Sequence, residues 1–348
     1  MEIKNIWPWF LGGVGVVVLS AGIFLIALPG QRNTAGIVRQ HKIGDTTELV
    51  GISSGASDVE DTDTDEDIAL PKVHVLIVTH SEESESYNRS EEMFESSRKV
   101  LVQFAEMLHD EGVAWNYQSD WTFLLAATQY DAGDASTNNK NFLQYFKEDL
   151  GFEIDPHAHE TQYNYADVAY LISQLGVEPS GVVGGFVASP ASESKLEYLQ
   201  NTIHGNVYSY AWKPEVLWGG AVGGHQNESD LWVSGIWNPK DAEHFTEDGG
   251  NLPDVGGYYT TWEGLDALLA KDLDPGKIYT QAIFAGQRTL TDESIEAFRA
   301  QIEKRKSDKR IVWVGLTELI SIWESEYHSE SNILKYDGDV TSKGKGPK

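Results

Sequence analysis

The sequence contains no cysteine among its 348 residues. This absence excludes disulfide bonds, thiolate metal ligands and a cysteine nucleophile. Basic residues are also scarce, because 26 Lys and Arg stand against 54 Asp and Glu, which gives a formal net charge of -28. A surface of this charge repels phosphate backbones, so we expect no nucleic acid among the partners of the protein.

Motifs of several common enzyme classes are missing as well. The chain has no phosphate-binding P-loop, no H-E-x-x-H zinc motif and no glycine-rich dinucleotide fingerprint. Aromatic residues, in contrast, are abundant, with 11 Trp and 15 Tyr. We expect most of these rings in the core. Some of the tryptophans lie in or beside glycine-rich segments near expected strands and are candidates for stacking on sugar rings, with ordinary packing as the alternative: Trp212, Trp218 and Trp237.

A long apolar run stands near the N-terminus. Residues 7–28 (WPWFLGGVGVVVLSAGIFLIAL) contain no charged side chain. A run of this length can cross a bilayer as one helix, and Trp7 and Trp9 stand at one end, where interfacial aromatics are found. We predict a single-pass membrane anchor in residues 1–30, with the folded domain on the extracytoplasmic side. Residues 31–70 are polar and acidic without apolar periodicity, so we expect a flexible linker there.

From residue 71 to residue 330 the sequence alternates between short apolar runs and helical patterns. Residues 72–79 (KVHVLIVT) are typical of a strand buried on both faces, and residues 91–111 have helical spacing that ends at Gly112. Repeated strand–helix units predict parallel strands with right-handed crossovers. We therefore expect an α/β fold, a (β/α) barrel of seven to eight strands, followed by a disordered tail over residues 331–348. The other expected strands are residues 113–123, 151–154, 181–187, 207–212, 231–237, 278–284 and 310–315, and the other expected helices are residues 139–149, 165–175, 195–203, 293–306 and 316–327.

The segment Asp155-Pro156-His157-Ala158-His159 follows the third expected strand. If the strand extends through it, alternation places Asp155, His157 and His159 on one side. Two imidazoles on one strand face can bind a divalent metal together, because neutral imidazole is the commonest nitrogen ligand of zinc-like ions. His157 and His159 are therefore candidate metal ligands. The alternative is a surface loop that contains two unrelated histidines.

Other expected strand ends also carry polar residues, and active residues of (β/α) barrels lie at the carboxyl ends of strands. The first strand is followed by His80, Glu82 and Glu83. His80 and Glu82 share a face and are candidate ligands, with a solvated loop as the alternative. Asp120 follows the second strand and is a candidate base or substrate ligand, or else a residue that caps the next turn. His225 lies in a segment rich in glycine and tryptophan and is a candidate general acid.

The layout resembles the polysaccharide deacetylase superfamily, metal-dependent carbohydrate esterases on an incomplete (β/α) barrel. The third strand of that family carries the pattern glycine-hydrophobic-E-I-G-x-H-x-x-x-H, whose histidines bind the metal, and residues 151–157 (GFEIDPH) are similar to its start. Thr161 stands where the second histidine is expected, whereas His159 gives an H-x-H pattern, as in the distant chitooligosaccharide deacetylases. The T-F-D-D motif of the first strand is replaced by T-H-S-E, so that Ser81 stands at the base aspartate and Glu82 at the metal aspartate.

The resemblance implies a membrane-anchored deacetylase that acts on acylated poly- or oligosaccharides with one divalent metal ion, expected to be zinc. The metal ligands would come from the set His157, His159, Glu82 and His80. Because Ser81 cannot act as the base, another carboxylate would do so, and His225 would protonate the leaving group; the candidate bases are Glu83, Asp120 and Asp155. Two alternatives remain: a glycoside hydrolase on a similar barrel that uses two carboxylates and no metal, and a catalytically inactive carbohydrate-binding surface protein.

Overall fold

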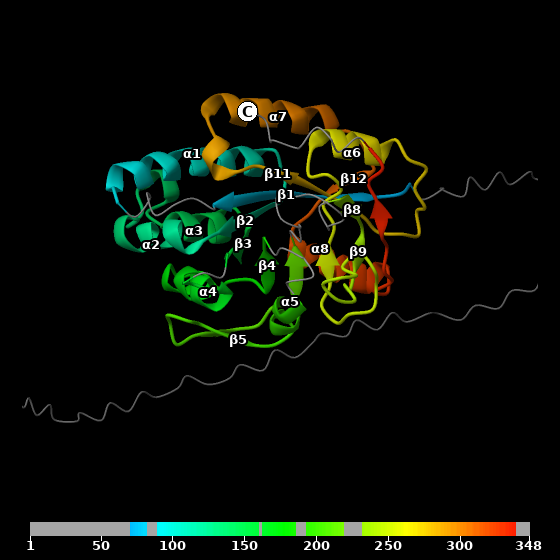
Figure 1. The fold of residues 1–348 in the computed structure, drawn as a ribbon. Coiled ribbons are helices and arrows are strands. Elements are labelled where there is room, and N and C mark those ends of the chain that lie inside the picture. The colour runs from blue at the N-terminus through cyan, green and yellow to red at the C-terminus, as the bar shows by residue number, and fades with distance from the viewer. Residues whose placement is uncertain (1–69, 82–88, 160–161, 186–192, 219–231, 339–348) are drawn as a thin grey trace, which may run out of the picture. The chain divides into compact units, whose positions relative to one another are not determined.

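The structure is a computed structural model that describes residues 70–81, 89–159, 162–185, 193–218 and 232–338 (Figure 1). All of these residues belong to one compact unit of the chain, which starts at Asp65. The expected anchor and most of the expected linker lie outside the described residues. Within the described ranges, no helix is long and apolar enough to cross a membrane.

A parallel sheet of five strands forms the centre of this unit. Strand β1 (Val73–Ser81) lies between β11 (Tyr279–Phe284) and β2 (Trp115–Ser119), and β2 pairs with β3 (Glu153–Pro156). Strand β12 (Ile311–Trp313) also pairs with β1, along residues 73–75. Every residue of β1 is buried, which confirms the prediction of a strand covered on both faces.

A second sheet is joined to the first on both sides. Its strands β4 (Val182–Gly184), β7 (Val216–Trp218) and β10 (Asp254–Val255) are parallel, and β9 (Ile236–Trp237) runs antiparallel to β10. An isolated parallel bridge between His157 and Gly184 links the end of β3 to β4. On the other side, the backbone N–H groups of Ala282 and Phe284 on β11 donate to the carbonyl oxygens of Gly257 and Thr260, which follow β10 (3.1 and 3.2 Å).

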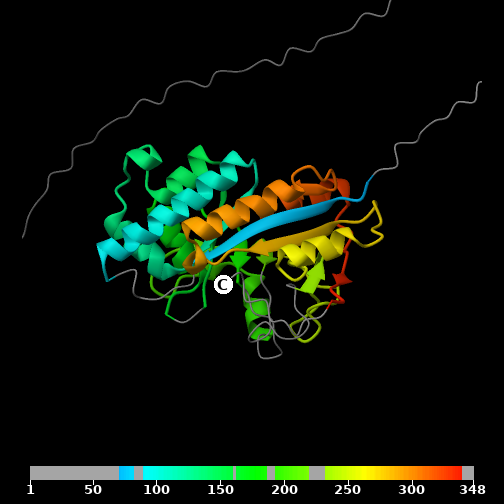
Figure 2. The same ribbon diagram turned by 90° about the horizontal axis from the view of Figure 1, so that it is seen from above.

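Helices surround these sheets, and two short antiparallel pairs complete the fold. Figure 2 shows α1 (cyan) and α7 (orange) side by side, and their ends are joined by ion pairs from Arg299 and Lys306 to Glu111. The helices are α1 (Glu91–Asp110), α2 (Trp121–Tyr130), α3 (Phe142–Gln144), α4 (Tyr165–Gln174), α5 (Glu193–Leu199), α6 (Trp262–Leu269), α7 (Asp292–Arg305) and α8 (Leu316–Glu326), with short turns η2 (Ala135–Thr137), η3 (Tyr145–Asp149) and η6 (Gln287–Thr289). The antiparallel pairs are β5 (Ile203–His204) with β6 (Ala211–Trp212), and β8 (Val233–Ser234) with β13 (Leu334–Lys335).

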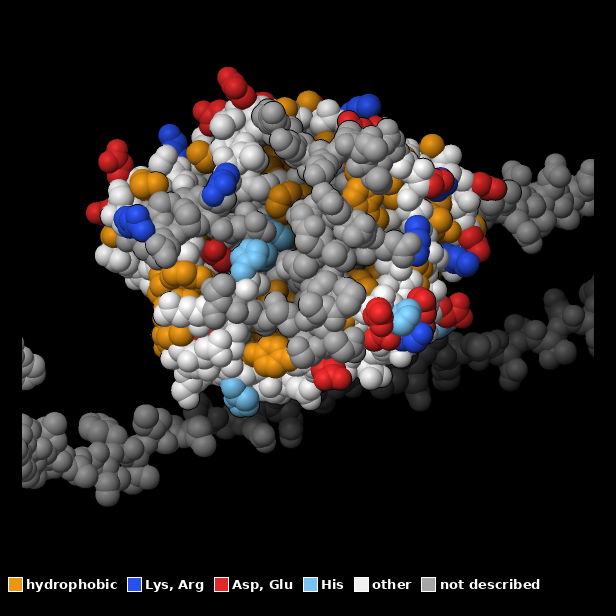
Figure 3. Space-filling model, viewed as in Figure 1, with side chains coloured by type: hydrophobic (Ala, Val, Ile, Leu, Met, Phe, Trp, Pro, Cys, Tyr) orange, Lys and Arg blue, Asp and Glu red, His pale blue; other side chains and the backbone are white. Residues whose placement is uncertain are grey.

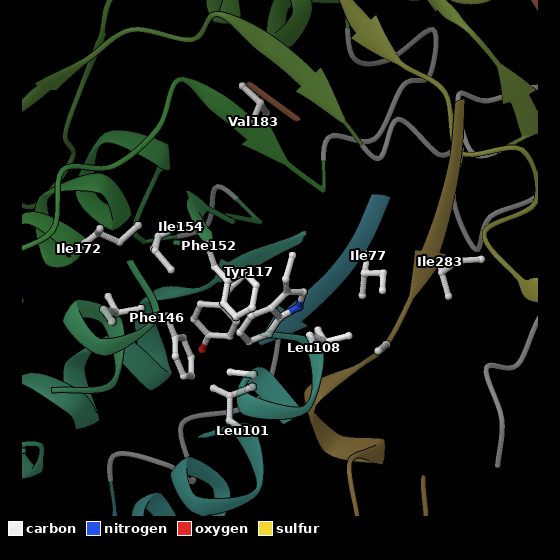
Figure 4. Close-up of a cluster of buried hydrophobic side chains, with 14 of the residues drawn as sticks. Ile77, Leu101, Leu108, Tyr117, Phe146, Phe152, Ile154, Ile172, Val183 and Ile283 are labelled. Carbon is white, nitrogen blue, oxygen red and sulfur yellow. The ribbon is translucent and has the colours of Figure 1, made fainter. Parts of the chain in front are cut away.

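Side chains alternate between two hydrophobic cores along the central strands. Ile77 of β1 belongs to the larger core, where Leu101 and Leu108 of α1 are directed toward Tyr117 of β2 (Figure 4). Leu76 and Val78 belong to the smaller core, together with apolar residues of the second sheet. The smaller core therefore lies between the two sheets, and the alternation directs His80 to the same side as Leu76 and Val78.

The structure changes several expectations about the elements. The strand expected over residues 207–212 is reduced to β6, and the strand expected over residues 231–237 is divided into β8 and β9. Residues 113–123 were expected to form a strand and its exit loop. The strand ends at Ser119, but a helix replaces the loop, because the Asp120 side chain accepts from the backbone N–H groups of Thr122 and Phe123 and starts α2. The helix expected over residues 139–149 is divided into α3 and the wider turn η3. Strands β7 and β10 and helix α6 had not been expected at all.

The folded part also extends beyond residue 330, where the tail was expected to begin. Strand β13 pairs with Val233 and Ser234 of β8. Just after β13, the ring of Tyr336 stacks on Tyr259, with ring centroids 4.7 Å apart. The described fold therefore continues to Gly338.

Candidate functional site

The carboxyl ends of β1, β2 and β3 lie side by side. The strand register places His80 beside Gln118, and Gln118 beside Asp155. Past the last paired residues, the N–H of Asp120 donates to the carbonyl oxygen of Ser81 (3.1 Å), and the N–H of His157 donates to that of Ser119 (3.0 Å). The expected candidates at the ends of three separate strands therefore meet at one edge of the sheet.

His157 is the best-fixed side chain of this edge. Its ring is fully buried, and Nδ1 lies 2.9 Å from the carbonyl oxygen of Gly184. A carbonyl oxygen can only accept, so Nδ1 carries a proton, and in the neutral ring Nε2 then keeps its lone pair. The hydroxyl of Tyr165 donates to the same carbonyl oxygen (2.8 Å), which holds the acceptor in place. The ring of His157 therefore presents Nε2 to the site.

The side chains of His159 and His157 approach each other through their Nε2 atoms. The two Nε2 atoms are 3.2 Å apart, and the rings are nearly perpendicular. His159 is exposed, whereas His157 is buried beneath it. Figure 3 shows histidine side chains gathered in the middle of one face of the molecule, where the surface is hollowed.

Glycine is required beside His157. Gly185 has φ +75°, and a Cβ atom built on it would lie 2.0 Å from Cε1 of His157. No side chain can occupy that space without displacing the imidazole. The pair Gly184-Gly185 is visible in the sequence but lacks phosphate-binding spacing, and the contact of its second member with a histidine 28 positions earlier could not be read from it.

His80 completes a group of three imidazoles. Its ring centroid lies 4.3 Å from that of His157, and its ring makes edge contacts with Trp218 (5.4 Å) and Phe284 (5.0 Å). Trp218 is 1 % exposed and therefore cannot stack on a sugar in this structure. It packs on a histidine of the site instead.

The other two tryptophans considered for sugar stacking are buried as well. The indole N–H of Trp212 donates to the carbonyl oxygen of Ser180 (2.8 Å), and that of Trp237 donates to Phe245 (2.7 Å). Ordinary packing is therefore the role that the structure gives them. The reason is that the segments around them form β6, β7 and β9 rather than an open loop.

Asp120 caps α2 and lies in the electric field of His157. Its Oδ1 accepts from the N–H of Thr122 (3.0 Å), the hydroxyl of Thr122 (2.6 Å) and the N–H of Phe123 (3.4 Å). Burial raises the pKa of the Asp120 carboxyl, and the bonds from Thr122 and the nearby His157 oppose this rise. Because the cap bonds all go to Oδ1, Oδ2 is the oxygen that would accept a proton.

Asp155 lies in the buried part of β3, before the histidines. It is fully buried, and the hydroxyl of Ser180 donates to its Oδ1 (2.5 Å). Burial and, next, the charge of Glu153 raise the pKa of the Asp155 carboxyl well above its usual range. Asp155 and His157 are two residues apart, and we expected both on one strand face. In the structure the Asp155 carboxyl bonds instead to Ser180, on the loop before β4.

Two histidine nitrogens fit a shared metal ion. Nitrogens bound to one tetrahedral zinc at about 2.0–2.1 Å lie roughly 3.3 Å apart, and the Nε2 atoms of His157 and His159 are 3.2 Å apart. Within the described ranges, no group of three or more His, Asp or Glu side chains is arranged to hold a metal ion. Glu82, Glu83 and His225 lie outside the described residues.

Comparison with known proteins gives structural similarities of low score. The sequence matches no protein-family model, and no curated protein matches it. A 4-alpha-glucanotransferase from Thermococcus litoralis has a TM-score of 0.46 and 12% identity over 72% of this chain and 40% of its own, so the match spans less than half of that enzyme. Puue allantoinase has a TM-score of 0.45 and 13% identity over 72% of this chain and 90% of its own. A structure described as T48 deacetylase with substrate has a TM-score of 0.33 and 12% identity over 77% of this chain and 97% of its own. At these scores the similarities assign neither a family nor an activity.

Proposed function

We propose that the protein is a metal-dependent hydrolase that removes acyl groups from poly- or oligosaccharides. The observation that carries this proposal is the pair of Nε2 atoms of His157 and His159, which lie 3.2 Å apart at the carboxyl end of β3. The Gly184 carbonyl fixes the tautomer of His157 that a metal requires, with the proton on Nδ1. A hydrogen bond between two neutral imidazoles gives a similar distance, so metal content is the deciding measurement.

The architecture we infer is an incomplete barrel of seven parallel strands. Its order would be β1, β2, β3, β4, β7, β10 and β11, returning to β1. Two contacts support the closure between the sheets: the bridge from His157 to Gly184, and the bonds from β11 to Gly257 and Thr260. In such a barrel the carboxyl ends of the strands are the usual place of the active site.

The proposed metal ligands are His157 and His159, with a third from the end of β1. The candidates are Glu82, outside the described residues, and His80, whose ring centroid lies 4.3 Å from that of His157; the described side chains alone form no three-ligand group. A zinc-like ion, when bound, polarises an acyl carbonyl and lowers the pKa of a bound water. Our proposal needs Nε2 of both histidines unprotonated, because only a free lone pair can bind the ion.

Asp120 is the proposed base among the described carboxylates. Its cap bonds fix the carboxyl group in one orientation, and burial raises its pKa, which makes the carboxylate a stronger proton acceptor. Asp155 accepts from the Ser180 hydroxyl, and we propose that it supports the strand before His157 rather than acting as the base. Glu83 as a base and His225 as the acid that protonates the leaving group remain proposals on residues outside the described ranges.

The test combines metal analysis with acetate release. We expect wild-type protein from zinc-supplemented medium to carry about one zinc-like ion per chain and to release acetate from acetylated chito-oligosaccharides. His157→Ala and His159→Ala should each lose the ion and the activity. His204→Ala, an exposed histidine on β5, is the matched control and should keep both.

Wild-type protein without metal would refute the metal-dependent mechanism. New reducing ends from a polysaccharide, without acetate release, would instead indicate a glycoside hydrolase. Binding without either product would indicate a carbohydrate-binding protein.

We also propose that residues 7–28 anchor the protein in a membrane, with the folded domain on the extracytoplasmic side. The support is the charge-free run and its terminal tryptophans Trp7 and Trp9. Protease digestion of intact cells should remove the folded domain from the cell surface. Resistance before lysis and digestion after it would place the domain on the cytoplasmic side.

A further inference from the structure

Gln118 is a buried polar residue to which the proposed mechanism gives no role. In the strand register it lies on β2 between His80 of β1 and Asp155 of β3. Paired residues of neighbouring parallel strands point to the same side of a sheet, so the Gln118 side chain is directed, like that of His80, toward the smaller core. Its exposed fraction is 0 %. The amide therefore lies inside the fold, at the level of the residue two positions before His157.

The Gln118 amide has poor hydrogen bonds for a group so deeply buried. Neither Oε1 nor Nε2 forms a hydrogen bond of ordinary geometry with a described residue, and Oδ2 of Asp155 forms none either. The amide is nevertheless close to the Asp155 carboxyl, because burial raises the pKa of that carboxyl and Gln118 is among the groups that oppose the rise. A buried polar group without good partners costs about 1–3 kcal/mol. Stability alone would therefore favour an apolar side chain at this position.

Gly184 provides the space that the amide occupies. A Cβ atom built on Gly184 would lie 2.7 Å from Cδ of Gln118 and closer still to its Oε1. Gly184 is also the residue whose carbonyl oxygen accepts from Nδ1 of His157 and from the Tyr165 hydroxyl. Gln118 therefore contacts the residue that orients His157.

We propose that Gln118 is a positioning residue, whose amide rests between Asp155 and Gly184 and keeps the Gly184 carbonyl where Nδ1 of His157 can donate to it. The side chain links three strands at one level, because it starts on β2, faces Asp155 on β3 and fills the space beside Gly184 on β4. It acts through Gly184 rather than on a substrate. Its effect on metal binding rests on the proposed function, but its effect on the position of the His157 proton does not.

The first measurement is the tautomer of His157 in the metal-free full chain in detergent. Long-range proton–nitrogen correlation spectra of protein labelled in its histidines, at about pH 8 where imidazoles are neutral, distinguish a ring protonated on Nδ1 from one protonated on Nε2. The spectrum of His157→Ala identifies the signals. Wild-type His157 should be protonated on Nδ1 alone. In Gln118→Ala the Gly184 carbonyl loses its support, so both nitrogens should show the intermediate shifts of a mixture of tautomers.

The second measurement is metal affinity, by competition for zinc with a chelator. Partners that orient a metal-binding histidine typically contribute about 10–100-fold, and because Gln118 acts through Gly184 we expect Gln118→Ala to weaken the affinity by roughly tenfold. Gln281→Ala is the matched control. Gln281 is also fully buried on a central strand, but it pairs with Val75, far along β1 from His80. The control should lower stability without changing the tautomer or the affinity.

A compensating pair of substitutions separates this contact from a general loss of stability. Gly184→Ala should disturb the tautomer of His157, because the new methyl group meets the Gln118 amide. In the double variant Gln118→Ala/Gly184→Ala the methyl group enters the space that the amide leaves, so the wild-type tautomer should largely return. Two independent losses would add instead. If Gln118→Ala does not fold, Gln118→Met replaces it, because methionine keeps the length of the side chain but is flexible and has no amide; the same change of tautomer is expected.

A wild-type tautomer and wild-type zinc affinity in the folded Gln118 variant would overturn the role of Gln118 and leave the proposed function standing. A double variant more disturbed than either single variant would also overturn it. A mixture of tautomers in the Gln118 variant of a protein that binds no zinc would support the role and refute the metal-dependent mechanism.

Discussion

Nδ1 of His157 donates to the carbonyl oxygen of Gly184 across the gap between β3 and β4. The bond does more than join two strands, because it determines which nitrogen of the ring faces the site. The Tyr165 hydroxyl donates to the same oxygen, so α4 also contributes to the orientation of the imidazole. Partners of this kind fix the tautomer of a metal-binding histidine.

Gly185→Ala adds one methyl group, which should displace the His157 ring. The new Cβ would lie 2.0 Å from Cε1 of His157, and the backbone has φ +75°. We expect a loss of about 2–4 kcal/mol of unfolding free energy from strain and overpacking together. Metal affinity should fall with it, as measured by competition with a chelator.

Gly151→Ala is the control for this backbone effect. Gly151 has nearly the same φ, +76°, but a Cβ atom there would meet nothing within 4 Å. The variant should lose only about 1–2 kcal/mol through backbone strain and should keep wild-type metal affinity. Equal effects of the two substitutions on metal binding would contradict the contact between Gly185 and His157.

Asp120→Asn should separate the capping role of Asp120 from its proposed chemical role. Asparagine keeps an oxygen for the cap of α2 but cannot accept a proton as a base. We expect a melting temperature near that of the wild type and a fall in kcat of at least about a hundredfold. Asp120→Ala should in addition lose roughly 1 kcal/mol of stability. Thr291→Ala is the control, because it removes the cap of α7 and should lower stability without lowering kcat. If Asp120→Asn kept the wild-type kcat, Asp120 would be a helix cap and not the base.

His74 should make the fold sensitive to acid. Burial lowers the pKa of its imidazole, while the Tyr279 carbonyl and the charge of Glu326 raise it and Lys72 lowers it further. A lowered folded-state pKa means that the unfolded chain takes up the proton more readily. The stability from the neutral ring is therefore present above the ordinary pKa of about 6.5 and is lost as the pH falls through the folded-state pKa.

Denaturant unfolding of His74→Gln between pH 7.5 and pH 5 would measure this effect. The variant should lose less stability over that range than the wild type, although it starts from a lower value. His204→Gln changes an exposed histidine and should follow the wild-type pH dependence. Parallel curves for His74→Gln and the wild type would exclude His74 as a source of the acid sensitivity.

Thr260→Asn should stabilise the protein. Tyr258, Tyr259 and Thr260 all have positive φ (39°, 76° and 50°), a region that β-branched residues rarely adopt. Asparagine tolerates this conformation better, and we expect a gain of up to about 1 kcal/mol. Thermal unfolding would show the gain, whereas Thr317→Asn, inside α8, should give none.

Local sequence patterns predicted the long elements and the histidine pair. The apolar run of β1 and the helical spacing of α1 are properties of consecutive residues, as is the alternation that places His157 and His159 together. Strands β7 and β10 have three and two residues, too few to show a period. Helix α2 was not predicted, because its apolar residues follow those of β2 almost without a break. Its start is determined by the Asp120 side chain.

The long-range contacts of the site could not be predicted in the same way. The place of Gly184 and Gly185 beside His157 depends on the pairing of β3 with β4, and nothing in the local sequence specifies it. Trp218 is buried in the smaller core and contacts His80, which is 138 positions earlier in the sequence. Those residues determine how the imidazoles are oriented, so sequence patterns gave the candidates of the site but not their support.

The pairing of β1 has a consequence for the order in which the protein is made. His74 of β1 bonds to Tyr279 at the start of β11, 205 residues later. At about 5–20 residues per second, the ribosome completes β11 roughly 10–40 seconds after β1. During that interval one edge of the most apolar strand has no native neighbour, and such an edge can pair with other chains. We therefore expect the nascent protein to be open to aggregation at this edge for more than half of its own synthesis, and slower translation should lengthen that period.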